Sequence, residues 1–458
     1  MNATGRNAVV LGLGLTGFSL ARHLSAQGAT VRVADTRPAP PFADRLRAEC
    51  PGVALATGPI TDATLAGADL VAISPGIAAG QGPIAAAVAR GAELVGDVEL
   101  FARALPPAQK VLAITGSNGK TTVTALAGAL ARAAGLATVV AGNIGEAVLD
   151  AIPGDNRWPD VFVLELSSFQ LETTSSLAPV AATVLNITEN HLDRYAGIDA
   201  YAAAKARIFA RGGAQVLNMD DPRSLAMRLP GRLVQTFGAG VPVSEEAWGI
   251  VDRGIDGGGA WLARGGALLL PIADLKLVGR HNAQNALAAL ALVSSVARID
   301  RSVLAALARF EGLPHRMHRI ADAGGVAYVD DSKGTTVAAT RAALDGIDGA
   351  VVLIAGGDGK GQDFAPLRAS VDARCRAVLL IGRDAPLLER ALAGTRAAIE
   401  RCGTLDAAVA RAVALAAPGD TVLLSPACAS LDQFANYVER GERFASLVRT
   451  LTAERAHA

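Results

Sequence analysis

The feature that most restricts the fold of this chain is a short apolar run followed by a glycine-rich turn and a helical pattern, which occurs twice. Residues 8–11 precede the turn GLGLTG at residues 12–17, and residues 111–114 precede the turn TGSNGK at residues 115–120. Further apolar runs alternate with helical patterns to the end of the chain. Strands that alternate with helices pair in parallel. The sequence therefore predicts an α/β fold with mostly parallel sheets.

The second glycine-rich turn, TGSNGKTT at residues 115–122, is typical of a phosphate-binding loop. Glycines let the backbone wrap closely around phosphate oxygens, and the helix N-terminus adds partial positive charge. Lys120 is predicted to reach the β- and γ-phosphates, and Thr121 to hold Mg²⁺. The motif departs from the standard P-loop, because Ile114 stands where the first glycine would be. The alternative interpretation is a glycine-rich turn without a ligand.

The first glycine-rich turn matches a dinucleotide-binding fingerprint. Gly12, Gly14 and Gly17 lie between a strand and a helix, and Asp35 follows Gly17 by eighteen residues at the end of the next apolar run. The pattern predicts a Rossmann-like turn but does not identify the ligand. An NAD-dependent oxidoreductase is one reading of it, although that reading leaves Lys120 without a role.

The length of 458 residues suggests about three domains, at roughly 150 residues each. Proline-rich and glycine-rich interruptions at residues 106–107 and 312–314 are typical of linkers. We expect a Rossmann-like domain over residues 1–98, a central P-loop-type domain over residues 99–312 and a Rossmann-like α/β domain over residues 313–458.

The charge and cysteine content exclude several classes of protein. Lysine plus arginine and aspartate plus glutamate both number 43, so the balance does not suggest nucleic-acid or membrane-surface binding. The four cysteines are scattered, which indicates reduced thiols rather than disulfides or a zinc site. No leader-like segment or membrane-spanning apolar run is evident. We expect a cytoplasmic monomer.

Several motifs together resemble the Mur ligases, the ATP-dependent amide-forming enzymes of peptidoglycan synthesis. Besides the loop at residues 115–122, the similar segments are ELSSFQL, NITENHLD, GRHNAQN, GLPHR and DSKGT, at residues 165–171, 186–193, 279–285, 312–316 and 331–335, and the stretch at residues 425–434. The resemblance covers almost the whole chain. It implies three domains and a reaction in which ATP phosphorylates a carboxylate and an amine then displaces phosphate through a tetrahedral intermediate.

The resemblance also implies roles in the central domain. Lys120, Glu165, His191 and Lys205 are expected to be catalytic, and Lys205 to be carbamylated. Glu165, His191 and carbamylated Lys205, with Thr121, are expected to hold Mg²⁺. Without the resemblance, Glu165 is a strand-end carboxylate, His191 a loop histidine and Lys205 a solvated helix lysine. The expected ATP contacts are Gly116, Ser117, Asn118, Gly119, Lys120, Thr121, Thr122, Asn282, Arg316 and Asp331.

The outer domains are implied to hold the two substrates to be joined. The first domain resembles that of members adding D-glutamate to UDP-N-acetylmuramoyl-L-alanine. The implied UDP-substrate contacts are Leu15, Thr16, Asp35, Thr36, Arg37, Ser74 and Gly76, with Asn143 from the central domain. The implied amino-acid contacts are Lys333, Thr335, Lys360, Ser425 and Phe434. Phe434 also suits simple core packing, and Thr336 departs from the asparagine common at its position.

Other functions stay open on the sequence alone. A sibling ligase would add a different amino acid, and a folate polyglutamate-type ligase would share the ATP module but lack a UDP-binding first domain. A non-catalytic nucleotide-binding scaffold would bind ATP without turnover. Each predicts a different outcome when candidate substrates are exchanged in an assay.

Overall fold

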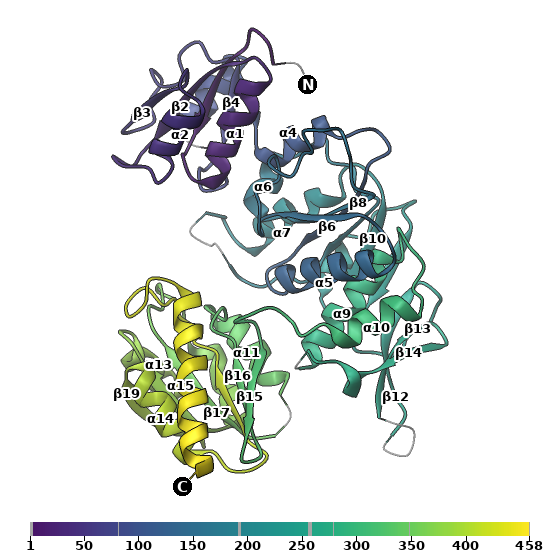
Figure 1. Ribbon diagram of the computed structural model, residues 1–458, viewed down its shortest axis with the longest axis vertical. Coiled ribbons are helices and arrows are strands. Elements are labelled where there is room, and N and C mark those ends of the chain that lie inside the picture. Colours follow the sequence, from purple (N-terminus) through teal and green to yellow (C-terminus); the bar gives the residue numbers. More distant parts are fainter. Residues whose placement is uncertain are drawn as a thin grey trace. The chain divides into compact units, whose positions relative to one another are not determined.

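The computed structural model of the chain describes residues 3–80, 82–190, 194–254, 259–277, 279–347 and 349–457, with side chains up to residue 453. It contains three sheets (Figure 1). The chain divides into two compact units: the first runs to Gly249 and takes in Ala263–Ala267 and Leu287–Ala306, and the second holds the remainder. The three sheets, whose strands pair mostly in parallel, confirm the predicted α/β fold.

The first sheet has five parallel strands in the order β3-β2-β1-β4-β5. A Cβ atom on Gly17 would lie 1.7 Å from the carbonyl oxygen of Gly12, so only glycine lets α1 approach the turn after β1 this closely. The strands are Asn7–Leu11, Thr30–Asp35, Ala54–Thr57, Leu70–Ile73 and Glu93–Val95 (β1–β5), and the helices are Leu15–Ala26, Ala43–Glu49, Gly82–Ala89 and Asp97–Ala104 (α1–α4).

The central sheet has nine strands in the order β14-β13-β12-β11-β10-β9-β6-β8-β7. Residues 111–114 of β6 are almost fully buried, as expected of a parallel strand covered on both faces. The strands are Lys110–Thr115, Thr138–Gly142, Val161–Glu165, Ala181–Val184, Ala214–Asn218, Val234–Phe237, Ala247–Asp252, Ala260–Arg264 and Ala267–Pro271 (β6–β14). The helices are Lys120–Ala133, Ser168–Glu172, Ile198–Ala206, Pro222–Ala226, Arg280–Val293 and Arg301–Arg309 (α5–α10).

The C-terminal sheet has six strands in the order β15-β16-β20-β17-β18-β19, and β15 alone among them pairs antiparallel. The four inner strands coincide with apolar runs of the sequence, whereas the edge strands β15 and β19 are half-exposed and lack a continuous apolar run. The strands are His318–Ala323, Val326–Asp330, Val351–Gly356, Cys375–Ile381, Ala398–Gly403 and Thr421–Leu424 (β15–β20). The helices are Val337–Asp345, Arg368–Arg374, Ala385–Leu392, Leu405–Leu415 and Tyr437–His457 (α11–α15).

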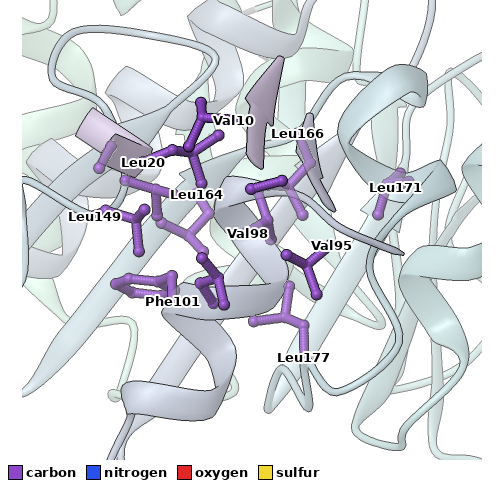
Figure 2. Packing of buried hydrophobic residues seen from close by; sticks show 14 of the residues in the cluster. Val10, Leu20, Val95, Val98, Phe101, Leu149, Leu164, Leu166, Leu171 and Leu177 are labelled. Atoms are coloured by element: carbon purple, nitrogen blue, oxygen red, sulfur yellow. The ribbon is translucent and has the colours of Figure 1, made fainter. Parts of the chain in front are cut away.

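A shared apolar cluster joins the first sheet to the central one (Figure 2). Val10 and Leu20 come from the first domain, whereas Leu149 and Leu164 come from the central domain. Phe101, on the connecting helix α4, packs edge-on against Phe162 with ring centroids 5.1 Å apart. Burying this surface stabilises the contact between the two domains. Among the described residues, no helix is both long and apolar enough to cross a membrane.

Candidate active site

The phosphate loop connects β6 to α5, and its glycines determine its shape. Gly116 and Gly119 have φ angles of 153° and 80°, in the region that favours glycine. Lys120 is the first residue of α5, and its Nζ donates to the carbonyl oxygen of Ser117 at 3.0 Å. The N-terminus of this fourteen-residue helix therefore adjoins the loop, an arrangement suited to binding phosphate.

A second loop, after β9, supports the phosphate loop. Asn186 accepts from the backbone N–H of Ser117 at 2.9 Å and from that of Asn118 at 2.8 Å. The Ser117 hydroxyl donates to the carbonyl oxygen of Thr188 at 3.1 Å and accepts from the Thr188 N–H at 2.9 Å. Asn186 and Thr188 are thus supporting residues to which the sequence analysis gave no role. The sequence signal that could have identified them is that both are polar residues following a buried strand.

Glu165 ends β8, the neighbour of β6 in the sheet, and its side chain is almost fully buried. Its Oε1 accepts from the side-chain amide of Asn143 at 2.8 Å, so the structure brings together two residues predicted for the site. Its Oε2 is buried and, within the described part of the chain, has no hydrogen-bond partner. A buried carboxylate oxygen without a partner is costly. This atom is therefore suited to a hard cation such as Mg²⁺.

Lys205 lies on α7 and is 1% exposed, so it is not a solvated helix lysine. Its Nζ donates to the Oγ1 of Thr115 at 3.2 Å and lies 4.6 Å from the ring centroid of Tyr201. Burial lowers the pKa of Lys205 well below its ordinary value, and the charge of Lys120 lowers it further, while Glu165 opposes both. The environment therefore favours the uncharged amine.

The predicted metal ligands are only partly described. His191 lies outside the described residues, and those residues contain no group of three or more His, Cys, Asp or Glu side chains that could hold a metal ion. Thr121 is the second residue of α5. The hydroxyl of Thr121 and the unpaired oxygen of Glu165 are both oxygen donors, which fit Mg²⁺.

In the first domain, Asp35 shapes the turn that carries the predicted UDP-substrate residues. Its Oδ2 accepts from the N–H of Leu13 at 2.6 Å, and its Oδ1 accepts from the N–H of Arg37 at 2.8 Å. The Arg37 guanidinium also bonds to both oxygens. These side-chain bonds lower the pKa of Asp35 to about 2, although burial opposes them. Both carboxylate oxygens are thus engaged within the protein, which disfavours their binding a nicotinamide-cofactor ribose.

The other predicted residues of this domain follow strand ends. Leu15 is exposed at the start of α1, and Thr36 is exposed after β2. The Ser74 hydroxyl, after β4, donates to the carbonyl oxygen of Gly12 at 3.0 Å, and Gly76 lies exposed two residues on. The carboxyl ends of parallel strands are where ligands bind in such sheets. Thr16 is half-buried in the first turn of α1.

In the C-terminal domain, Asp331 and Ser425 bond to each other. Asp331 is nearly buried; its Oδ2 accepts from the Ser425 hydroxyl at 2.7 Å, and its Oδ1 accepts from the N–H of Met317 at 3.2 Å. Burial raises the pKa of Asp331 to about 7, and the adjacent Asp330 adds to the shift. Ser425 is fully buried, so it can donate to a substrate carboxylate only by giving up Asp331.

Lys333 lies beside helix α15, in an arrangement that the sequence analysis did not foresee. Its Nζ lies 4.0 Å from the ring centroid of Tyr437, the first residue of that helix. Arg440, one turn later, is 1% exposed. The Arg440 guanidinium donates to the carbonyl oxygens of Ser332 at 2.8 Å and Cys428 at 3.2 Å. It thereby links the Lys333 loop to the loop after β20. The sequence carries no signal that Arg440 makes these contacts, because it shows only a charged residue within an amphipathic helix.

The remaining predicted residues of the second unit are less closely connected. Lys360 is exposed, with a φ angle of 50°. Gln362 connects neighbouring loops by donating to the carbonyl oxygens of Thr335 at 3.4 Å and Ala427 at 3.3 Å. Phe434 packs at the margin of an apolar cluster.

The predicted ATP contacts of this unit are held by local bonds. Asn282 is buried and accepts from Asn285 at 2.9 Å. Arg316 is half-buried and pairs with Leu313 in an isolated β-bridge. Thr336 caps α11 by accepting from the N–H of Ala339 at 3.3 Å, which gives the unusual threonine a structural role.

Three family models match successive parts of the chain. The Mur ligase MurD-like N-terminal domain matches residues 6–96, the Mur ligase middle domain residues 114–293 and the Mur ligase glutamate ligase domain residues 315–428.

The chain belongs to the Mur ligase family.

Individual relatives match the chain over its full length or nearly so. A UDP-N-acetylmuramoylalanine--D-glutamate ligase of Thiobacillus denitrificans is 53% identical, over 100% of this chain and 98% of its own. One of Methylobacillus flagellatus is 54% identical, over 97% of each chain. Among solved structures, a MurF ligase of Thermotoga maritima in complex with ADP has a TM-score of 0.59 at 16% identity, covering 99% of this chain and 96% of its own. At that identity the structural likeness shows the fold alone.

Proposed function

We propose that this Mur ligase adds D-glutamate to UDP-N-acetylmuramoyl-L-alanine, with ATP as the source of energy, in the synthesis of peptidoglycan precursors. The observation that carries the proposal is the full-length match, at about half identity, to ligases of that name. The match extends through all three family domains, so it includes the parts of the chain that we assign to the acceptor, the nucleotide and the amino acid.

The geometry of the central domain supports activation of a carboxylate by ATP. The phosphate loop holds the triphosphate, and Lys120 turns from the carbonyl oxygen of Ser117 to the β- and γ-phosphates. The acceptor carboxylate attacks the γ-phosphorus, the bond to the bridging oxygen breaks and ADP leaves. The amine of the amino acid then attacks the acyl carbon, and inorganic phosphate leaves from a tetrahedral intermediate. Negative charge accumulates on oxygen atoms in both steps, so cationic groups stabilise them.

Glu165, with the Thr121 hydroxyl and with His191 and Lys205 as further ligands, is assigned to Mg²⁺. The ion would supply electrostatic stabilisation of the phosphoryl and acyl oxygens. The protein's own contribution is to keep Oε2 of Glu165 buried and unpaired, while Asn143 fixes the other oxygen at 2.8 Å. Glu165→Gln should therefore abolish Mg²⁺-dependent turnover while ATP still binds to the loop.

We assign a carbamate to Lys205. An uncharged amine is the form that reacts with carbon dioxide, and the buried position of Lys205 lowers its pKa in favour of that form. The carbamate would replace an ammonium with an anion that has two oxygen atoms, suited to a hard cation. Lys205→Ala should be inactive and regain part of its activity with added short carboxylic acids. An inactive variant that these acids do not rescue would count against the carbamate.

The decisive assay exchanges the substrates. Product should form only when ATP, Mg²⁺, UDP-N-acetylmuramoyl-L-alanine and D-glutamate are all present. Turnover with L-lysine or diaminopimelate, and none with D-glutamate, would instead show a sibling activity. Absence of nucleotide hydrolysis in the presence of acceptor and amino acid would refute the proposed function.

The outer-domain assignments are part of the same proposal. The first domain is assigned the UDP end of the acceptor, through the loops that carry Leu15, Arg37 and Ser74. The C-terminal domain is assigned D-glutamate, with Lys333 and Lys360 as its cationic contacts. The protein is further proposed to act as a monomer in the cytoplasm.

A further inference from the structure

Arg194 joins the first domain to the central domain beside Gly76, a predicted contact of the UDP-linked substrate. Its Nη1 donates to the carbonyl oxygen of Pro75 at 2.9 Å, and its Nη2 donates to that of Ile77 at 3.2 Å. Pro75 and Ile77 flank Gly76 in the loop after β4. The same guanidinium therefore holds the backbone of a loop assigned to the UDP-linked acceptor.

On its other side, Arg194 is fixed to helix α6 of the central domain. Its Nη2 forms an ion pair with Oε2 of Glu172 at 2.7 Å, and its guanidinium carbon lies 4.1 Å from the ring centroid of Phe169. The Arg194 side chain is only 13% exposed, so the pair is largely shielded from solvent. Helix α6 begins three residues after Glu165, and its capping box through Ser167 and Gln170 fixes its start.

Aromatic contacts continue from Arg194 toward the proposed catalytic groups. The Tyr195 hydroxyl donates to Oε1 of Glu172 at 2.5 Å, and the Tyr195 ring stacks on Phe169. Tyr195 also lies against Tyr201, with ring centroids 5.4 Å apart, and Tyr201 carries Lys205 over its face. A single packed group thus connects the loop at residues 74–77 with the surroundings of Lys205.

We propose that Arg194 is a positioning residue that sets the distance between the two ends of the acceptor site. The inference rests on the proposed function, in which the UDP end lies on the first domain and the reacting carboxylate lies near Glu165. A long acceptor fits both ends only if the loop at residues 74–77 keeps its place relative to α6. An error of about 1 Å in such placement can cost roughly 100-fold in rate.

Arginine is the side chain that this position requires. Its planar guanidinium donates to two carbonyl oxygens and one carboxylate while its face stacks on Phe169. A lysine ammonium has neither the fork nor the planar face, so it cannot keep all of these contacts. Arg194→Lys is therefore expected to behave like Arg194→Met rather than like the wild type.

A second polar contact between the same domains provides a matched control. Asp150 of the central domain accepts from the Ser19 hydroxyl at 2.5 Å and pairs with Arg22 at 2.7 Å. Both partners lie on α1 of the first domain, away from the loop at residues 74–77 in sequence. Asp150→Asn weakens the attachment of the first domain but leaves the Arg194 contacts intact.

The experiment compares steady-state kinetics of the full chain with binding of UDP alone. We expect Arg194→Met and Arg194→Lys to lower kcat/KM for the UDP-linked acceptor by about tenfold or more, and to change KM for ATP and D-glutamate by less than about threefold. UDP affinity should change by less than about threefold, since the Ser74–Gly12 bond still shapes the loop. Glu172→Gln, which keeps the carbonyl contacts, should show a smaller loss.

The outcomes separate the possible roles of Arg194. Equal losses in kcat/KM for Asp150→Asn and Arg194→Met, at equal loss of thermal stability, would reduce Arg194 to a general domain contact and overturn the proposal. So would a parallel loss of UDP affinity or an unchanged kcat/KM. If Arg194→Met does not fold, Arg194→Lys and Glu172→Gln decide the question. Wild-type turnover, measured alongside, shows independently whether the proposed function itself holds.

Discussion

Two buried carboxylates, Glu99 on α4 and Asp331 after β16, have opposite pKa shifts. Glu99 is 1% exposed and Asp331 is 7% exposed, so burial alone would raise both pKa values. Glu99 accepts from the N–H groups of Ser175 at 2.6 Å and Ser176 at 2.9 Å, from the Ser176 hydroxyl and from Arg103. These donors outweigh burial and lower the pKa of Glu99 to about 2.

Asp331 has fewer donors and a like charge beside it. Ser425 and Met317 each donate one hydrogen bond, while Asp330 is its neighbour in the chain. Burial and Asp330 therefore raise the pKa of Asp331 to about 7. The comparison shows that hydrogen-bond donors and neighbouring charges, set against burial, decide which form a buried carboxyl takes. Glu99 is fully satisfied and serves the fold, whereas Asp331 has capacity left for a ligand.

The largest expected effect separates the two residues by activity. Asp331→Asn removes a carboxylate at the proposed ATP contact and should lower kcat/KM for ATP by about 100-fold, because a site built to hydrogen-bond a ligand loses much affinity when one of its polar partners is removed. Its thermal stability should change little below pH 4, where Asp331 is protonated in the folded protein. Steady-state kinetics with varied ATP measure this, with exposed Asp322→Asn as the control. A large loss of stability with normal kinetics would instead mean that Asp331, like Glu99, stabilises the fold and does not contact ATP.

The second prediction concerns the stability of the Glu99 region. Glu99→Gln leaves buried donors of Ser175 and Ser176 without a full partner, and should destabilise the first unit by on the order of 2 kcal/mol. Thermal unfolding followed by circular dichroism measures the shift. Exposed Glu389→Gln, which breaks a surface pair with Arg401, should cost much less. Unchanged kcat at a temperature well below unfolding is expected for both variants.

The third prediction uses pH to distinguish the two carboxyls. The folded pKa of Asp331, about 7, exceeds its ordinary 3.8. Its contribution to stability is therefore present below 3.8 and lost as pH rises through 7. The folded pKa of Glu99, about 2, is below its ordinary 4.5, so its contribution is present above 4.5 and lost as pH falls toward 2. In unfolding scans, Asp331→Asn should flatten the curve between pH 4 and 7; Glu99→Gln should flatten it only below 4.5.

The smallest effect tests the donor count directly. Ser425→Ala removes one of the hydrogen bonds to Asp331, which should raise the pKa of Asp331 further and cost about 1 kcal/mol. The pH at which the Asp331 contribution disappears in unfolding scans should move upward. A downward movement would mean that the donor count does not explain the comparison. If Ser425 also binds the amino acid, KM for D-glutamate should rise in the same variant.

Much of the site could be predicted because its residues lie in short contiguous motifs. The phosphate loop, Glu165 at a strand end and Asp331 after β16 each follow an apolar run, and parallel topology places such residues at the carboxyl edge of a sheet. Other features depend on contacts between distant segments. The bond between Ser425 and Asp331, and that between Arg194 and Pro75, join residues about a hundred positions apart.

The sequence by itself determined the α/β class, the strand ends that carry the site and the chemistry of the phosphate loop, because strand periodicity and glycine-rich turns are local properties. Only the tertiary structure decided which polar groups are already satisfied. Asp35 is engaged by Arg37, Glu99 is saturated, and one oxygen of Glu165 lacks a partner among the described residues. That distinction depends on burial and on donors from remote segments, which the order of residues along a chain does not record.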